Sequence, residues 1–262
     1  MTYLFSPEGM TALRAFIDAK TLFAFDLDGT LAPIVSDPAG IRISDSVRQR
    51  LVRLNNLAPF AVITGRSRID ALTHLGFTPR FLIGNHGAEG LPGTAAKAAD
   101  FFAICLEWRA QLTHILPGMT DLGIVLEEKG QSLALHYRKA TDPNAARLQI
   151  LAAIELLQPA PRVVSGIYVK NLAPVDAPHK GVALNTLMKH LGCGQAIFVG
   201  DDVTDEDVFE MKNSAILGIR VGESQESHAD CFIKDQVEGY EIQKAKVEAE
   251  EKYLVEKSDI TF

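Results

Sequence analysis

Two short apolar runs in this chain of 262 residues each end in a pair of carboxylates. The first run leads into Asp26 and Asp28 within FAFDLDGT, and the second leads into Asp201 and Asp202 within IFVGDDVTDED. A bare carboxylate at the end of a buried strand costs several kcal/mol, so something must meet these acids. Carboxylate oxygens, with positions left for phosphate and water, are ligands that Mg²⁺ takes in proteins. If the two strands are parallel neighbours, their acids meet at one edge of a sheet and predict a magnesium site there.

A plainer interpretation exists for these residues when each is taken alone. Asp and Gly after a strand are also the residues of an ordinary polar turn. Thr64 could be a simple strand-end residue, and Lys180 could be a solvated lysine before a helix. Two strands that both end in paired acids favour a site over two unrelated turns.

The segments that must position these acids alternate between strand-like and helical patterns. In the first part of the chain the alternation covers, in order, 21–29, 44–57, 59–65, a helix from about Ser67, and 80–87. This strand–helix–strand rhythm is typical of a parallel sheet with helices on both faces. The rhythm returns after Lys180, with a helical stripe and then strand-like runs at 195–202, 215–222 and 231–235.

A different pattern lies between these two parts. A helix around 101–116 is followed by two strand-like runs with a turn at Lys129-Gly130, by a helix at about 143–157 and by a strand-like run at 162–170. We therefore expect an α/β protein with two domains. Residues 1–96 and 170–262 would form a Rossmann-like parallel sheet core, and 97–169 an inserted α+β domain. The charge-rich tail 241–257 is expected to be a solvated helix to which we assign no function.

Composition excludes several classes of function. The net charge is −7 and no basic run exists, so we expect no nucleic-acid partner. No apolar run reaches the roughly 18 residues of a membrane span, and the N-terminal segment does not resemble a signal peptide. Cysteines occur without a C-x-x-C pair and are expected to be buried thiols in a reducing compartment, at Cys105, Cys193 and Cys231. These features predict a cytoplasmic protein.

Four ordered motifs, DLDGT, ITGRS, HKG and GDDVTDED, resemble those of the haloacid dehalogenase superfamily in its phosphatase branch. The resemblance implies that Asp26 is a nucleophile that forms an aspartyl-phosphate. Asp28 would first protonate the leaving oxygen and then activate water. Thr64 and Lys180 would hold the phosphoryl oxygens, whose charge grows in the transition state.

The same resemblance implies a metal set and a lid. Mg²⁺ would sit on Asp26, on the backbone carbonyl of Asp28 and on Asp201, with Asp202 and Asp205 as a further ligand or as groups around the ligands. The insert 97–169 falls between the second and third motifs. In this superfamily that position holds a C2-type cap, which closes over the substrate and supplies specificity.

Two further stretches, LIGNHGAE and LEEKGQSLALHYRKA, resemble trehalose-6-phosphate phosphatases. By this resemblance the cap would contact sugar hydroxyls through Glu127, Lys129, His136 and Arg138. The core side of the pocket would be lined by Arg66, Asn85 and His86. The plain alternative is a strand that carries His136 and Arg138 on one exposed face.

One segment departs from this family's pattern. Before the motif lysine the family usually reads V-E-x-x-P, with a glutamate that binds sugar, whereas this chain reads YVKNLAPVDAPHKG. Lys170 or its neighbour stands where the glutamate is expected. A lysine there would invert the charge, lose an acceptor for hydroxyls and add a donor for an anion.

We therefore expect a Mg²⁺-dependent phosphatase that takes trehalose 6-phosphate, a phosphorylated disaccharide, with a functional link to a trehalose-phosphate synthase. A phosphatase of another glycosyl phosphate, of the glucosylglycerol- or sucrose-phosphate type, is the first alternative, and the replaced glutamate favours it. The second is a non-catalytic sugar-phosphate sensor, which predicts an incomplete catalytic set. A mutase is a further alternative, because mutases share the paired acids. Only the large cap with its sugar-like motifs argues against a mutase, and it does so by analogy.

Overall fold

The computed structural model describes residues 1–35, 40–239 and 242. It divides the chain into two compact units, Met1–Pro92 with His179–Phe262, and Gly93–Pro178. The expected domain change at 169/170 falls inside strand β8 (Val169–Ala173), which pairs with two strands of the second unit. Residues 170–178 therefore belong with the insert, because their strand completes its sheet. The helix expected over 241–257 lies outside the described residues, apart from Ile242.

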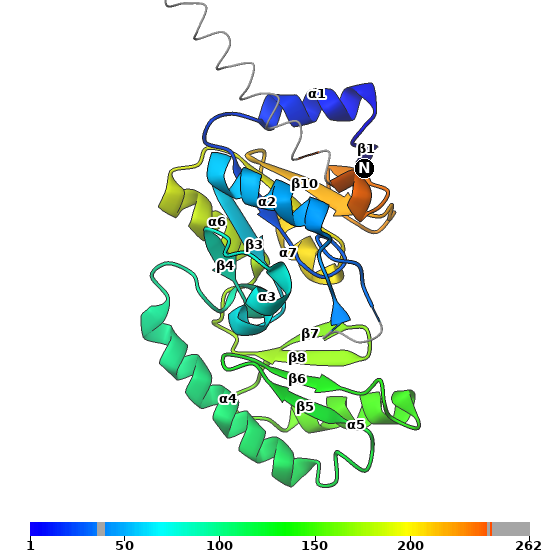
Figure 1. The fold of residues 1–262 in the computed structure, drawn as a ribbon. Helices are drawn as coiled ribbons and strands as arrows, with labels where there is room; N and C mark the ends of the chain where they lie inside the picture. The colour runs from blue at the N-terminus through cyan, green and yellow to red at the C-terminus, as the bar shows by residue number, and fades with distance from the viewer. Residues whose placement is uncertain (36–39, 240–241, 243–262) are drawn as a thin grey trace, which may run out of the picture. The chain divides into compact units, whose positions relative to one another are not determined.

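The first unit contains a parallel sheet (Figure 1), in which the described residues form seven strands in the order β1-β11-β10-β9-β2-β3-β4. Every pairing between these strands is parallel. In chain order they are β1 (Thr2–Tyr3), β2 (Leu22–Phe25), β3 (Phe60–Ile63), β4 (Phe81–Ile83), β9 (Ala196–Gly200), β10 (Ile216–Val221) and β11 (Cys231–Ile233). This confirms the α/β class that the alternating pattern predicts.

The central strands are apolar throughout because helices bury both of their faces. Successive side chains point to opposite faces of a strand, so Phe25 packs in one core with Leu51, while its neighbour Ala24 packs in the other core with Leu184. Helices of this unit include α1 (Pro7–Phe16), α2 (Asp45–Leu57), α3 (Arg68–Leu75), α6 (Lys180–Leu191) and α7 (Glu206–Phe209). None of the helices in the described ranges combines the length and apolarity that a membrane crossing requires.

The second unit is an antiparallel sheet covered by two helices, α4 (Ala95–Ile115) and α5 (Pro143–Glu155). The sheet order is β5-β6-β8-β7, with β5 (Val125–Glu128), β6 (Leu133–His136) and β7 (Arg162–Gly166) beside β8. Leu135 and Leu172 of the sheet pack with Trp108 of α4 and Ile150 of α5. The run expected as one strand over 162–170 is two strands, because the chain turns at Tyr168, whose φ is +59°.

Candidate active site

The acids that end β2 and β9 meet at one edge of the parallel sheet. Phe25 pairs with Val199, and the N–H of Asp26 donates to the carbonyl of Val199 over 2.9 Å. Each of Asp26, Asp201 and Asp205 offers a carboxylate oxygen, and these oxygens lie within 4.8 Å of one another. The convergence expected for parallel neighbouring strands is therefore present.

Lys180, the first residue of α6, lies against these acids. Its Nζ donates to Oδ1 of Asp26 over 2.9 Å and to Oδ1 of Asp205 over 2.7 Å. The other oxygen of Asp205 accepts from the N–H groups of Asp201 and Asp202, at 2.9 Å each. Asp205 thus holds both the lysine and the loop that carries the second pair of acids. Gly200 is required beside it, because a Cβ at that position would overlap the Asp205 side chain.

Two residues that follow Asp28 in the chain lie against Asp201. Thr30 donates from its hydroxyl to Oδ1 of Asp201 over 3.0 Å. Gly29 has φ +84°, and a Cβ there would overlap the Asp201 carboxylate. The D-x-D-G-T motif therefore brings its own glycine and threonine to the acid of a distant strand. Thr30 was not among the sequence candidates, although it stands next to Gly29 in the motif that pointed to the site.

Asp28 and Asp202 direct their carboxylates elsewhere. Arg66 donates from Nε and Nη2 to the two oxygens of Asp28, over 2.7 Å each. Asp202 accepts from the N–H of Val203 over 2.7 Å and so caps a short 3₁₀ helix. The metal set predicted from the sequence is Asp26, the backbone carbonyl of Asp28, Asp201 and Asp202, with Asp205 as a further ligand or a group around the ligands. The structure groups the side chain of Asp205 with those of Asp26 and Asp201.

Thr64, Asn85 and His86 follow the next two strands at the same edge of the sheet. Thr64 is fully buried at the end of β3, and its carbonyl accepts from the N–H of His86 over 2.9 Å. Asn85 is also buried, and its Nδ2 donates to Glu89 over 3.1 Å. Asn85 and His86 have φ values of +51° and +56°, so the loop after β4 is tightly turned. Gly65 lies in the loop after β3, and a Cβ there would overlap the ring of His86 in the loop after β4. This explains why position 65 is a glycine.

The carboxyl groups of the acidic centre ionise less readily than isolated ones. Burial raises the pKa of Asp26 well above its usual range, and the charge of Lys180 only partly opposes this. Burial and the charge of Asp205 raise the pKa of Asp201 to about 7. Burial alone would lower the pKa of Lys180, but the charges and hydrogen bonds of Asp205 and Asp26 outweigh it and raise that pKa. One lysine therefore does not balance the neighbouring carboxylates.

A divalent cation with oxygen ligands fits this donor set. Asp205 uses both of its oxygens, on Lys180 and on two backbone N–H groups. Asp26 and Asp201 are therefore the members of this group better placed to hold a metal, and both belong to the set expected from the sequence.

In the second unit, three of the four cap candidates lie together. His136 Nε2 is 2.7 Å from Oε2 of Glu127, and Lys129 Nζ is 3.8 Å from the same oxygen. Lys129 Nζ also donates to Oδ1 of Asn171 over 3.3 Å. Arg138 instead lies over the ring of Tyr168, with Cζ 5.4 Å from its centroid. We refer to Glu127, Lys129, His136 and Asn171 as the polar cap cluster.

The strand register decides which residue stands beside Glu127. Glu127 pairs with Ala134, which pairs with Asn171, so these three side chains share one face of the sheet. Lys170 pairs with Leu135 on the opposite face, towards the core of the unit. There it is buried and donates to Ser165 Oγ over 2.6 Å. Lys170 therefore points away from the polar cap cluster, and the neutral amide of Asn171 lies on the face of Glu127 instead.

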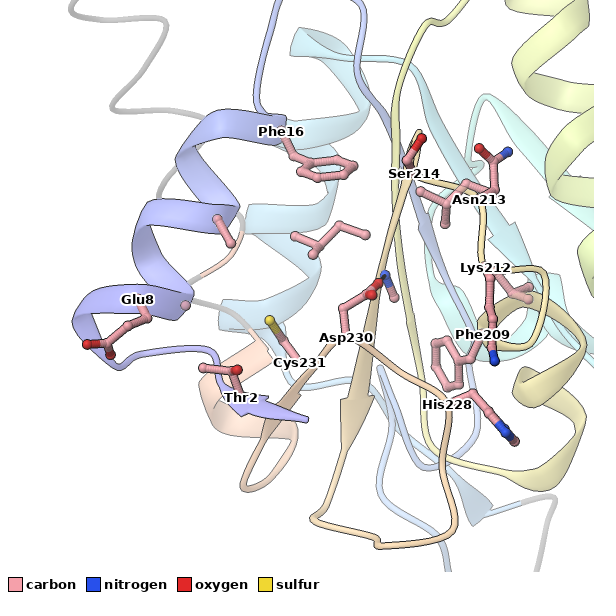
Figure 2. A pocket seen from close by; sticks show the side chains of 16 residues that line it. Thr2, Glu8, Phe16, Phe209, Lys212, Asn213, Ser214, His228, Asp230 and Cys231 are labelled. Atoms are coloured by element: carbon pink, nitrogen blue, oxygen red, sulfur yellow. Dashed lines mark hydrogen bonds between the residues drawn. The ribbon is translucent and has the colours of Figure 1, made fainter.

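A separate hollow in the first unit has a volume of about 500 Å³ (Figure 2). It lies between α1 and the strands β10 and β11, and is lined among others by Phe16, Phe209, Asp230 and Cys231. Its lining includes none of the candidate residues. Asp230 accepts from the N–H of Gly218 over 2.8 Å, which gives that acid a structural role.

A family model and curated relatives indicate the same family for this chain. The family model described as "Trehalose-phosphatase" matches residues 24–245. Probable trehalose-phosphate phosphatase 2 of Oryza sativa subsp. japonica is 27% identical over 91% of this chain and 72% of its own length. The trehalose-phosphate phosphatase of Mycobacterium avium is 31% identical over 75% of this chain and 53% of its own. The chain thus spans about half the length of that mycobacterial relative.

Among solved structures, trehalose-6-phosphate phosphatase of Aspergillus fumigatus aligns with a TM-score of 0.67. The alignment covers 95% of this chain and 100% of that one at 23% identity. This likeness concerns the fold. Because the alignment covers 95% of this chain, it includes both the parallel sheet and the inserted unit.

Proposed function

Because the chain belongs to the trehalose-phosphatase family of phosphoric monoester hydrolases, we propose that it hydrolyses trehalose 6-phosphate to trehalose and inorganic phosphate. The observation that carries the proposal is the meeting of Asp26, Lys180 and Asp201 at the carboxyl edge of the sheet. An oriented carboxylate beside a buried cation is suited to attack phosphorus, because the cation also binds the phosphoryl oxygens.

Asp26 acts as the nucleophile in this proposal. Its Oδ1 accepts from Lys180, which fixes the orientation of the carboxylate. A carboxylate oxygen of Asp26 forms a bond to phosphorus while the bond from phosphorus to the sugar oxygen breaks. Asp28 gives a proton to that departing oxygen and later takes one from the water that hydrolyses the aspartyl-phosphate. Thr64 contributes a hydroxyl at the end of the adjacent strand.

Asp26 and Asp201, with the backbone carbonyl of Asp28 that the family resemblance adds, would hold Mg²⁺. When bound, Mg²⁺ neutralises charge on the carboxylates and on the transferring phosphoryl group. Asp205 and Thr30 keep Asp201 in place, through its N–H group and its carboxylate respectively.

We assign sugar recognition to the polar cap cluster, because donors and acceptors of mixed charge suit the many hydroxyls of a disaccharide. On the core side, Asn85 and His86 are proposed for the same task.

A cytoplasmic location is supported by the three cysteines, which are all buried and unpaired. The proposed substrate also requires a synthase that joins two glucose units, which is the basis for a functional link to that enzyme.

The test is phosphate release from a panel of sugar phosphates with and without Mg²⁺. We expect trehalose 6-phosphate to be turned over at least about tenfold faster than glucose 6-phosphate, and turnover to stop with a chelator or in Asp26→Asn. Equal rates on the two sugars would overturn the proposed substrate. Activity that survives in Asp26→Asn would overturn the proposed mechanism.

One observation favours a second candidate, a phosphatase of another glycosyl phosphate such as sucrose phosphate or glucosylglycerol phosphate. Asn171 places a neutral amide beside Glu127 and Lys129, at the position where trehalose-6-phosphate phosphatases are expected to carry a glutamate. The same panel therefore includes both of these phosphates. A higher kcat/KM on one of them would select the second candidate.

A further inference from the structure

Arg66 is held between two carboxylates within the first unit. Its Nε and Nη2 donate to the two oxygens of Asp28, and its Nη1 donates to Oδ2 of Asp70, at 2.7 Å in all three cases. The Arg66 side chain is 12% exposed, whereas those of Asp28 and Asp70 are 36% and 47% exposed. A guanidinium that forks onto a carboxylate with two nitrogens fixes the plane of that carboxylate, which a lysine could not do.

The backbone of Arg66 is fixed independently of its side chain. Its N–H donates to Thr64 Oγ1 over 3.2 Å, and its carbonyl accepts from the N–H of Asn85 over 2.8 Å. What remains adjustable is the direction of the long side chain, whose rotamer freedom is large. Asp70 contacts the nitrogen that faces away from Asp28 and so limits this freedom.

Asp70 itself has a defined place in the first turn of α3. Its N–H donates to the N-cap Ser67 over 3.3 Å, and its Oδ1 lies 3.4 Å from His74 Nε2. Each of its two oxygens therefore has a partner, one on its own helix and one on Arg66. An acid that served only to favour the helix N-terminus would not need to reach Arg66.

We propose that Asp70 is a positioning residue for the phosphatase reaction, because it holds Arg66 and through Arg66 fixes the carboxylate of Asp28. The inference rests on the proposed function, in which Asp28 protonates the departing sugar oxygen. The fork uses one lone pair on each Asp28 oxygen and leaves a second one, on which the acid can carry the proton that it transfers. A general acid contributes only when that proton lies on the line of transfer, so a small rotation of the Asp28 carboxylate lowers the rate. Asp70 touches no reacting atom in this account.

The test compares two substrates that differ in their need for a general acid. A sugar alkoxide is a poor leaving group and requires a proton, whereas p-nitrophenolate leaves without one. In Asp70→Asn we expect kcat/KM for trehalose 6-phosphate to fall about tenfold, and kcat/KM for p-nitrophenyl phosphate to change by less than about twofold. The ratio of the two values does not depend on how much of the variant is folded, because both substrates report on the same folded enzyme.

The matched control is Asp45→Asn. Asp45 also lies in the first turn of a helix and pairs with an arginine, Arg48, at 2.7 Å, but it does not reach Asp28. We expect neither kcat/KM value to change in this variant. Arg66→Lys should lower kcat/KM for trehalose 6-phosphate more than Asp70→Asn does, because it removes the fork itself.

The inference is overturned if Asp70→Asn lowers both kcat/KM values by the same factor, or if it changes neither. Asp28→Asn separates this failure from a failure of the proposed function. A selective loss in Asp28→Asn without one in Asp70→Asn would refute the positioning role alone. A wild-type enzyme that releases no phosphate from trehalose 6-phosphate would refute the proposed function.

Discussion

Lys180 and Asp205 form an ion pair with Nζ and Oδ1 2.7 Å apart, and their side chains are only 1% and 0% exposed. Removal of one partner leaves the other charge buried without that partner. The free-energy cost of this change exceeds the net stability that the intact pair contributes. The pair also joins two parts of the core that are distant in the sequence, the start of α6 and the loop after β9.

The first prediction concerns this pair. Asp205→Asn keeps an acceptor for the N–H groups of Asp201 and Asp202. It removes one of the two carboxylates that pair with Lys180, leaves Asp26 as the other, and turns the amide NH2 towards the ammonium. We expect the free energy of unfolding in urea to fall by about 3 kcal/mol, since breaking a buried pair costs more than an exposed one. Glu210→Gln is the control, because the side chain of Glu210 is 62% exposed, and its stability should stay close to that of the wild type. Equal losses in the two variants would contradict the prediction.

The second prediction concerns pH and Mg²⁺. Burial, with the charge of Asp205 next, raises the folded-state pKa of Asp201 to about 7 from a usual value of 3.8. The folded state therefore binds this proton more tightly than the unfolded state, and metal-free stability should fall as the pH rises between these two values. Asp26 acts in the same direction, because its pKa is raised mainly by burial.

The measurement is the thermal midpoint with Mg²⁺ and with a chelator, at roughly pH 5 and roughly pH 8. We expect Mg²⁺ to raise the midpoint more at the higher pH, where the cation meets ionised carboxylates instead of competing with protons. In Asp201→Asn both the fall with pH and the effect of Mg²⁺ should be smaller. A Mg²⁺ effect that is equal at both pH values would refute this account.

A third prediction separates backbone strain from damage to the site. Gly29 and Gly93 have similar φ values, +84° and +82°, but a Cβ at Gly29 would overlap the Asp201 carboxylate, while at Gly93 it meets open space. Gly93→Ala should therefore cost only about 1 kcal/mol of stability and leave kcat unchanged. Gly29→Ala should abolish phosphate release and the Mg²⁺ effect on the thermal midpoint. Retention of either in Gly29→Ala would show that the close approach is not needed.

The sequence predicts the parallel core because its central strands are apolar at every position, as strands covered on both faces must be. Asp26 and Asp201 follow two such strands, and the parallel pairing of β2 with β9 brings them together. Their meeting could therefore be inferred before any coordinates were known. The two-residue strand β1 and helix α1 were not expected, since Thr2–Tyr3 is too short to show a pattern.

Which acid of GDDVTDED meets Lys180 could not be inferred in the same way. The motif offers five carboxylates within a few positions, and the 3₁₀ helix Val203–Asp205 decides which of them points inward. Asp202 begins that helix as its cap, and Asp205 returns at its end to the buried lysine. A turn of this kind depends on local hydrogen bonds and leaves no periodic trace in the sequence.

The sequence also does not show which of Lys170 and Asn171 lies on the sheet face that carries Glu127. Adjacent residues of a strand point to opposite faces, so an error of one position exchanges the buried residue for the exposed one. Only the pairing of β8 with β6 shows that Asn171 shares a face with Glu127.

The last prediction tests this assignment of faces. Asn171→Ala removes the acceptor that Lys129 contacts over 3.3 Å in the polar cap cluster. We expect KM for trehalose 6-phosphate to rise about tenfold, as for the loss of a hydrogen bond to a charged group, with little change on p-nitrophenyl phosphate, which has no sugar. Lys170→Met is the matched neighbour: it keeps the long side chain, removes the ammonium that contacts Ser165, and should lower stability while KM stays within about twofold. If Lys170→Met raised KM and Asn171→Ala did not, substrate recognition would lie on the opposite face of the sheet, and the polar cap cluster would lose its proposed role.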